Sequence, residues 1–307
     1  MEKIDFANFD LSVDRKILLE QATLEPLKFS EFNDARLYIQ RDDLIHPVIS
    51  GNKWRKLEGW IRYAKEQNFH TLVTFGGAFS NHLVATAAAG YQLGFKTIGL
   101  LRADEHIDNH YLNIARAYGM EIRGVSRELY RDKTQLFNEY SSFEGHLVIP
   151  EGGQGELAFE GFEALLASFC RPVDRIIHAS ATATTAVGLA LAIKKLKLNI
   201  RIKAVLVLKN FQQQLDYARE FGVDDMIDFV DGFHFGGYAK VTPDLLRFND
   251  GFYSETQIMV DPVYTAKALW ALREMIQCNE IKGEVVFLHT GGMLGRYSDK
   301  FQNMQIL

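Results

Sequence analysis

The segment that decides the fold reads S-G-N-K-W-R-K-L-E over residues 50–58, and it is followed by T-L-V-T-F-G-G-A-F-S-N-H over residues 71–82. The Gly-Asn pair of the first segment predicts a turn, and Lys53 follows it at the expected beginning of a helix. Most lysines are solvated, but one at such a helix start can point into a cleft. A poised amine that faces a polar helix start suits Schiff-base chemistry with a carbonyl compound. Its neighbours Arg55 and Lys56 are expected to be ordinary surface charges.

The second segment predicts a short strand over residues 71–75, a tight Gly-Gly turn and the start of a helix. Small residues at such a junction leave backbone N–H groups free to bind an anion. Ser80 and Asn81 also fit the role of helix caps, and His82 fits either a base or a structural histidine. A nucleotide-binding glycine loop is disfavoured because the G-x-G-x-x-G spacing is missing.

Apolar strand-like runs alternate with helix-like stretches along the chain, which predicts an α/β protein with parallel sheets covered on both faces. Glycine-rich joints at Gly51 and at residues 152–153 bracket a unit of domain size. We therefore expect a small inserted α/β domain over residues 51–150 and a larger, cofactor-binding domain from residues 1–50 plus 151–307, with a ligand in the cleft between them. The predicted strands cover residues 71–75, 96–102, 120–125, 146–150, 175–179, 203–208 and 284–289.

Composition narrows the class of protein. The chain has 307 residues, of which 47% are hydrophobic and 24% charged, and this is ordinary for a globular protein. The net charge of −5 argues against nucleic acid as the main ligand. Residues 1–10 lack the apolar core of a signal peptide, and the weakly polar run over 179–193 is too short to cross a bilayer, so we expect no membrane partner and a cytoplasmic location. Two cysteines form no disulfide framework, and Cys170 is expected to be a buried thiol.

A run of small and hydroxylated residues, A-S-A-T-A-T-T-A-V-G-L over 179–189, follows the predicted strand R-I-I-H. Such a run between a strand and a helix can cradle a phosphate through N–H and hydroxyl groups. It equally fits a buried helix capped by threonine. The absence of glycine before Gly188 weakens the phosphate interpretation, because glycine permits the closest approach.

Two segments near the C-terminal end add candidate ligand contacts. D-P-V-Y over residues 261–264 predicts a helix start, with Tyr264 in the first turn either stacked on a flat ring or buried in the core. Thr290, in F-L-H-T-G-G over 287–292, would lie at the carboxyl end of a strand, where ligands bind in open α/β sheets.

One pair of histidines has helical spacing, which puts both on one face. His106 and His110 are four residues apart, with Glu105 and Asp108 nearby. No third cluster of ligands is evident, so we predict no metal site.

Together these segments are more specific than any one alone. The chain resembles the family of 1-aminocyclopropane-1-carboxylate deaminase and D-cysteine desulfhydrase, from R-D-D-L at residues 41–44 to H-T-G-G at 289–292. The resemblance implies the tryptophan-synthase-β-like fold of fold type II pyridoxal-phosphate enzymes, with two open parallel-sheet domains. It also implies pyridoxal 5'-phosphate as cofactor, a small amino acid as substrate, and a homodimer.

The family pattern implies a role for each matched residue. Lys53, in G-N-K-x-R-K-L-E, would carry the cofactor, and Asn81 would hydrogen-bond the 3-oxygen of its ring. Ser80 would hold the substrate carboxylate or relay a proton, and His82 lies in the same substrate-binding segment. I-P-E-G-G-Q over 149–154 resembles a hinge, and G-G-Y over 236–238 supplies Tyr238 as a further active-site tyrosine. The phosphate loop G-S-G-G-T of the family corresponds to Ala181, Thr182, Ala183, Thr184 and Thr185.

The same resemblance bears on the reaction. Family deaminases have Tyr-Glu and H-L-G-G where this chain has Tyr264-Thr265 and H-T-G-G. The glutamate keeps the ring nitrogen protonated, and opening a cyclopropane needs that electron sink. Thr265 cannot supply this charge, whereas Thr290 can hydrogen-bond the nitrogen, as in desulfhydrases.

We therefore predict α,β-elimination from D-cysteine, giving pyruvate, sulfide and ammonia, with Lys53 as general base and Tyr264 stacked on the ring. Tyr238 would assist proton transfer. The alternatives are the cyclopropane deaminase, which gives 2-oxobutanoate and ammonia, and a degenerate homologue that binds the cofactor without turnover. Two departures from the family, the loop over 181–185 and Phe79 in place of a polar residue, favour a divergent substrate, and the stereoisomer stays open.

Overall fold

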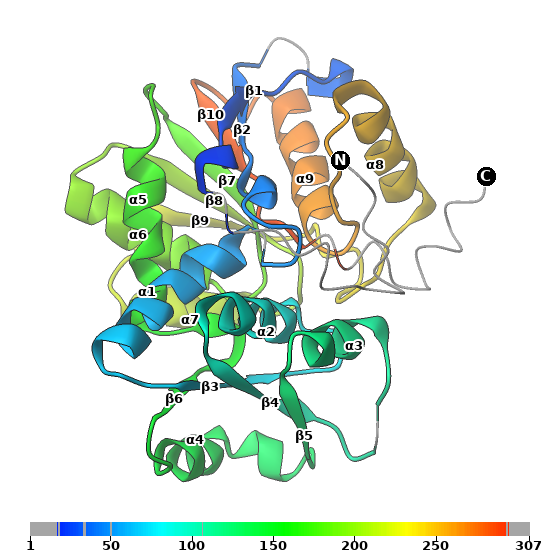
Figure 1. Cartoon of the computed structure of the whole chain (residues 1–307). Coiled ribbons are helices and arrows are strands. Elements are labelled where there is room, and N and C mark those ends of the chain that lie inside the picture. Colours follow the sequence, from blue (N-terminus) through cyan, green and yellow to red (C-terminus); the bar gives the residue numbers. More distant parts are fainter. Residues whose placement is uncertain are drawn as a thin grey trace.

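In the computed structural model the chain forms two β-sheets, and helices cover both faces of each sheet (Figure 1). The structure describes residue 17 and residues 19–32, 35–49, 51–105, 107–292 and 294. In this part of the chain, the smaller sheet has the order β5-β4-β3-β6 and the larger one β1-β2-β10-β7-β8-β9. All neighbouring strands are parallel except β1 and β2. The strands are β1 (Leu24–Pro26), β2 (Leu37–Gln40), β3 (Thr71–Gly76), β4 (Lys96–Arg102), β5 (Glu121–Val125), β6 (His146–Ile149), β7 (Arg175–Ser180), β8 (Arg201–Leu206), β9 (Ile227–Val230) and β10 (Val285–Leu288).

Helices pack on the sheets in layers because strand side chains alternate between the two faces. Ile176 of β7 belongs to the core on the side of α5 and α6, and Ile177 belongs to the core on the side of α8 and α9. In the smaller sheet, α2 and α3 cover one face and α4 the other (Figure 1). The helices are α1 (Asn52–Glu66), α2 (Asn81–Leu93), α3 (His110–Ala117), α4 (Lys133–Ser141), α5 (Gly161–Ala167), α6 (Thr184–Leu196), α7 (Phe211–Glu220), α8 (Pro243–Thr256) and α9 (Thr265–Gln277).

The predicted fold class is confirmed, since both sheets are parallel-rich and helices alternate with strands. All seven predicted strands form, as β3 to β8 and β10. Three short strands were not predicted, namely β1, β2 and β9, because sequences such as L-E-P and I-D-F-V lack an extended apolar run. The four strands of the smaller sheet fall inside the predicted small domain, whose boundaries stay a prediction.

Three other expectations concern places away from the cleft. The prediction of a buried Cys170 is wrong, because α5 already ends at Ala167 and the thiol is exposed. His106 lies outside the described residues, and within these no group of three metal-ligating side chains exists. No helix in the described ranges is long and apolar enough to cross a bilayer.

Candidate active site

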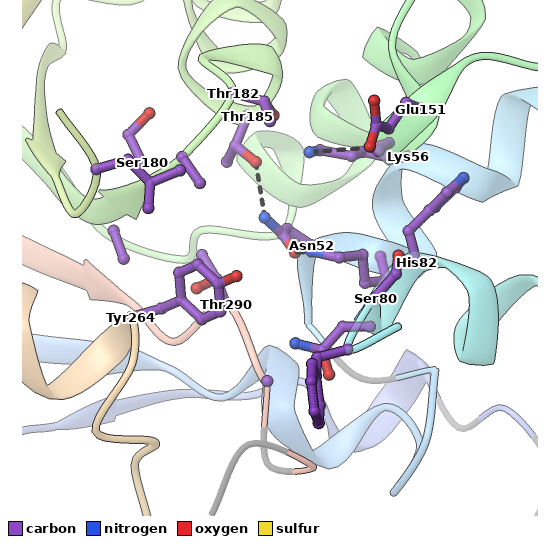
Figure 2. Close-up of a pocket in the computed structure, with 18 of the residues that line it drawn as sticks. Asn52, Lys56, Ser80, His82, Glu151, Ser180, Thr182, Thr185, Tyr264 and Thr290 are labelled. Atoms are coloured by element: carbon purple, nitrogen blue, oxygen red, sulfur yellow. Dashed lines mark hydrogen bonds between the residues drawn. The ribbon is translucent and has the colours of Figure 1, made fainter. Parts of the chain in front are cut away.

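A cavity of about 440 Å³ lies between the two sheets, lined by segments that follow the carboxyl ends of β3, β7 and β10 (Figure 2). Ligands of open parallel sheets bind at this edge. Figure 2 shows Tyr264 and Thr290 on one side of Asn52 and Ser80 and His82 on the other. The predicted site residues that line the cavity are Lys53, Ser80, Asn81, His82, Ala181, Thr182, Ala183, Thr185, Tyr238, Tyr264 and Thr290.

A close backbone contact places Lys53 at the cavity. Gly51 precedes α1 with a φ of 67°, and a Cβ atom there would lie 2.0 Å from the carbonyl oxygen of Thr290. Only glycine fits this left-handed and crowded position. The Asn52 N–H then donates to the same Thr290 oxygen at 3.3 Å, so the helix start is fixed against the end of the larger sheet.

The amine of Lys53 is prepared for nucleophilic chemistry. Its Nζ donates to Asn52 Oδ1 at 2.8 Å. Burial lowers the pKa of this amine from 10.5 to about 8, and the negative charge of Asp261 opposes part of that shift. A lysine with such a pKa keeps a useful neutral fraction near neutral pH, and the neutral amine is the nucleophile.

Asn52 joins the amine to the loop after β7. Its Nδ2 donates to Thr185 Oγ1 at 2.9 Å, across 133 positions of sequence (Figure 2). One amide therefore holds both Lys53 and Thr185, and all three residues line the cavity.

The expectation that Arg55 and Lys56 are surface charges is wrong. Arg55 is buried and pairs with the buried carboxylate of Asp42 at 2.9 Å. Lys56 lies one turn after Lys53 on the same face of α1, is 3% exposed and lines the cavity. Burial, together with the charge of Lys53, holds the pKa of Lys56 well below its usual range. Three-residue spacing in a helix was the available signal for this second amine.

The turn after β3 presents polar groups from the start of α2. Ser80 is the N-cap of this helix, and its Oγ accepts from the Leu83 N–H at 3.3 Å. The side-chain oxygen of Asn81 is buried and has no hydrogen-bond partner among the described residues. An unpaired buried amide oxygen is costly, so this position favours a ligand that donates an N–H or O–H to it.

His82 is a neutral side chain. Its Nε2 lies 3.0 Å from the Thr74 hydroxyl, and burial, with the charges of Lys53 and Lys56, lowers its pKa to about 3. The imidazole therefore takes up no proton near neutral pH, which weighs against His82 as a base and for the structural interpretation.

The loop over 181–185 is fixed from α7 rather than by glycines. Asn210 Nδ2 donates to the Ala181 oxygen at 2.8 Å, and Ser180 Oγ donates to Gln214 Oε1 at 2.5 Å. Ala183 precedes α6 with a left-handed φ of 55°. Thr184 differs from the other loop residues because it is fully buried and does not line the cavity. Its hydroxyl lies 3.2 Å from that of Thr182.

The start of α9 differs from its prediction by one residue. Tyr264 is the N-cap residue and not part of the first turn, because the carboxylate of Asp261 holds the chain ahead of the helix. Asp261 is fully buried and accepts from the Tyr264 N–H at 2.8 Å and from the Thr265 hydroxyl at 2.7 Å. Thr265 therefore faces Asp261, and it is not among the residues that line the cavity.

Tyr238 comes from a loop that a buried lysine holds in place. Lys267 of α9 is fully buried, and its Nζ donates to the carbonyl oxygens of His234 at 2.9 Å and Gly237 at 3.0 Å. The Tyr238 ring lies edge-on to Tyr264, with 6.3 Å between centroids. Sequence reasoning missed Lys267, since nothing in the pattern of α9 distinguishes an inward lysine from a solvated one.

The cavity fits the cofactor that the family resemblance implies. It offers the amine of Lys53, the amide of Asn81 with its unpaired oxygen, and the hydroxyl of Thr290. Thr182 and Thr185 stand at the positive N-terminal end of α6, where a phosphate is favoured. The volume of the cavity, about 440 Å³, lies in the range usual for small-molecule sites.

Comparison with known proteins agrees with these features. The family described as "Pyridoxal-phosphate dependent enzyme" matches residues 19–291. A putative 1-aminocyclopropane-1-carboxylate deaminase of Thermotoga maritima is 32% identical, over 88% of this chain and 93% of that protein. The mitochondrial bifunctional D-cysteine desulfhydrase/1-aminocyclopropane-1-carboxylate deaminase of Arabidopsis thaliana is 29% identical, over 90% of this chain and 76% of that protein.

Solved structures show the same fold. The crystal structure of an ACC deaminase homologue superimposes with a TM-score of 0.77 at 27% identity, covering 99% of this chain and 100% of the other. A threonine deaminase from Solanum lycopersicum, at 15% identity, has a TM-score of 0.62 and covers 92% of this chain and 83% of its own.

Proposed function

Because the chain belongs to the family of pyridoxal-phosphate-dependent enzymes, among the homologues of 1-aminocyclopropane-1-carboxylate deaminase and D-cysteine desulfhydrase, we propose that it is a lyase that eliminates the β-substituent of a small amino acid. D-cysteine is the proposed substrate, and pyruvate, sulfide and ammonia are the products. The observation that carries this choice is the pair of threonines: Thr290 lines the cavity, whereas Thr265 faces Asp261. Position 265, which family deaminases fill with the glutamate that keeps the ring nitrogen protonated, is threonine here, so proton abstraction from an α-carbon is favoured over ring opening.

The proposed roles are those that the family resemblance implies for side chains that line the cavity. Lys53 would hold the cofactor, and its Nζ, once free, would remove the α-proton of the substrate. Bound pyridoxal phosphate withdraws electrons from the α-carbon. Ser80 and Asn81 would orient the substrate carboxylate and the ring, and Tyr264 would stack on the ring.

The phosphate would lie against Thr182 and Thr185 at the start of α6. The amine of Lys56 lies on this side, since its Nζ is 3.4 Å from the Gly152 oxygen and a Cβ on Gly152 would be 3.9 Å from the Thr182 methyl. Its pKa is held well below the usual range, and a dianionic phosphate would raise that pKa again.

One experiment tests the proposed reaction against the first alternative. Purified protein with pyridoxal phosphate is incubated with D-cysteine, L-cysteine or 1-aminocyclopropane-1-carboxylate, and the keto acids are separated. Pyruvate from a cysteine isomer supports the proposal and identifies the stereoisomer. 2-Oxobutanoate alone would instead assign the deaminase, the activity in the names of several relatives.

The degenerate homologue is the second alternative, and the loop over 181–185 motivates it because alanine stands where the family has glycine. A working enzyme shows an absorption band near the visible edge that borohydride removes and that Lys53→Ala lacks. Protein that stays colourless with added cofactor would support a binding role only. The homodimer and the cytoplasmic location remain part of this proposal.

A further inference from the structure

Three aromatic side chains line the cavity, Phe79, Tyr238 and Tyr264, and a fourth, Tyr111, packs behind Phe79. Phe79 is 48% exposed and Tyr238 49% exposed, and both line the cavity. Phe79 packs edge-on against the buried Tyr111 of α3 at 5.7 Å between centroids, and Tyr238 packs edge-on against Tyr264 at 6.3 Å. Both sides of the cleft thus contribute rings to its mouth.

The Phe79 ring is held in this position before any ligand binds. Asn109 Nδ2 donates to the Ala78 oxygen at 3.0 Å, and the Ser80 N–H donates to the Gly77 oxygen at 3.1 Å. The backbone on both sides of Phe79 is therefore fixed. Ser80, the next residue, is the group proposed to orient the substrate carboxylate, so the ring lies beside the place of the substrate.

An exposed phenyl ring at a cavity mouth favours a ligand that removes it from water. The thiol of cysteine is too small to cover such a ring. An alkyl or aryl group on the sulfur would cover it, and each methylene group buried in an apolar site improves selectivity about 10-fold or more.

We propose that the same elimination also acts on S-substituted cysteines, whose sulfur bears an apolar alkyl or aryl group, that it prefers these to cysteine itself, and that Phe79 selects this group. The inference rests on the proposed elimination and specifies its leaving group. The α-proton is removed, the Cα–Cβ double bond forms, and the Cβ–S bond breaks with its electron pair on sulfur. The thiolate takes a proton and leaves as a thiol. The released aminoacrylate reacts with one water to give pyruvate and ammonia, without any oxidant or reductant.

The kinetic test compares cysteine with S-benzylcysteine, each as D- and L-isomer, and measures pyruvate. We expect kcat/KM to be about 10- to 100-fold higher for an S-benzylcysteine isomer than for the same isomer of cysteine. Phe79→Gln should remove most of this preference, and Phe79→Leu, which stays apolar, should keep most of it. Phe143→Gln is the matched control, because Phe143 is 49% exposed and packs on Tyr140 and His146, away from this cavity.

Calorimetry gives a readout that does not require turnover. D- and L-phenylalanine have the apolar group but no leaving group, and alanine has neither. Phe79→Gln should weaken binding of phenylalanine to the cofactor-loaded protein about 10-fold and leave alanine unchanged. Equal preference for cysteine and S-benzylcysteine, or a preference that Phe79→Gln does not alter, would overturn the inference. If no substrate yields pyruvate, the proposed elimination fails, and calorimetry alone decides whether Phe79 selects an apolar group.

Discussion

The lowered pKa of Lys53 has a measurable consequence for how fast the protein takes up its cofactor. Only the neutral amine attacks the aldehyde. At pH 7 an amine with a pKa of about 8 is about 9% neutral, and one with the ordinary value of 10.5 is about 0.03% neutral. Burial therefore raises the concentration of the nucleophile about 300-fold at this pH.

The assay mixes cofactor-free protein with pyridoxal phosphate between pH 6 and pH 10.5 and follows the band near the visible edge. We expect the rate to rise with pH and to reach half its maximum at about pH 8, since the folded-state pKa is about 8. Lys53→Ala should give no borohydride-sensitive band. A half-maximum near pH 10.5 would refute the argument, because the amine would then behave as if it were in water.

A substitution of Asp261 tests whether nearby charge contributes to the pKa of Lys53. Its negative charge raises the pKa of Lys53 against the effect of burial. Asp261→Asn removes that charge with little change of shape, so the half-maximum should move below pH 8 and loading at pH 7 should become faster. An unchanged or higher half-maximum, in a variant whose circular dichroism matches the parent, would contradict this electrostatic coupling.

Three further substitutions probe the supports of the site. Lys267→Met leaves two half-buried carbonyl oxygens without the lysine donor, and we expect about 1–3 kcal/mol less unfolding free energy in urea; an unchanged midpoint would show that water replaces the amine. Ala183→Gly relieves a left-handed φ of 55° and should raise the unfolding free energy by about 1 kcal/mol, measured in the same titration; an unchanged midpoint would show that the added freedom of the unfolded chain cancels the gain. Gly51→Ala places a methyl group 2.0 Å from the Thr290 oxygen and should prevent cofactor loading at any pH; normal loading would mean that the helix start can move.

Much of the fold was predictable because its strands are continuous apolar runs. β3, β4, β7 and β10 are buried on both faces, and their sequences show it. β9 was not predictable, since I-D-F-V has the polarity of a loop and becomes a strand only by pairing with β8. Tertiary context decides such short segments.

The candidate site likewise contains residues that local sequence predicts and residues that it does not. Lys53 and the turn after β3 were predictable, because a glycine turn and a helix cap are local signals. Lys56 had only its three-residue spacing from Lys53 as a signal and Lys267 had none, because a lysine in a helix has the same sequence signature whether its amine meets water or a backbone carbonyl. Asn52 acquires its bridging role only when residues 133 positions apart come together, which no local pattern encodes.

Because the bridge from Asn52 to Thr185 lies in the cofactor cavity, the lifetime of the protein should depend on the supply of cofactor. A molecule that fastens to both ends of this bridge stabilises the native chain by mass action, by about 2.7 kcal/mol when it is present at 100 times its dissociation constant. Chains made during vitamin B6 shortage would lack that stabilisation. A larger fraction of them would be unfolded at any time, and proteases would degrade them faster. Cellular abundance of this protein should therefore follow vitamin status even when its transcription does not change.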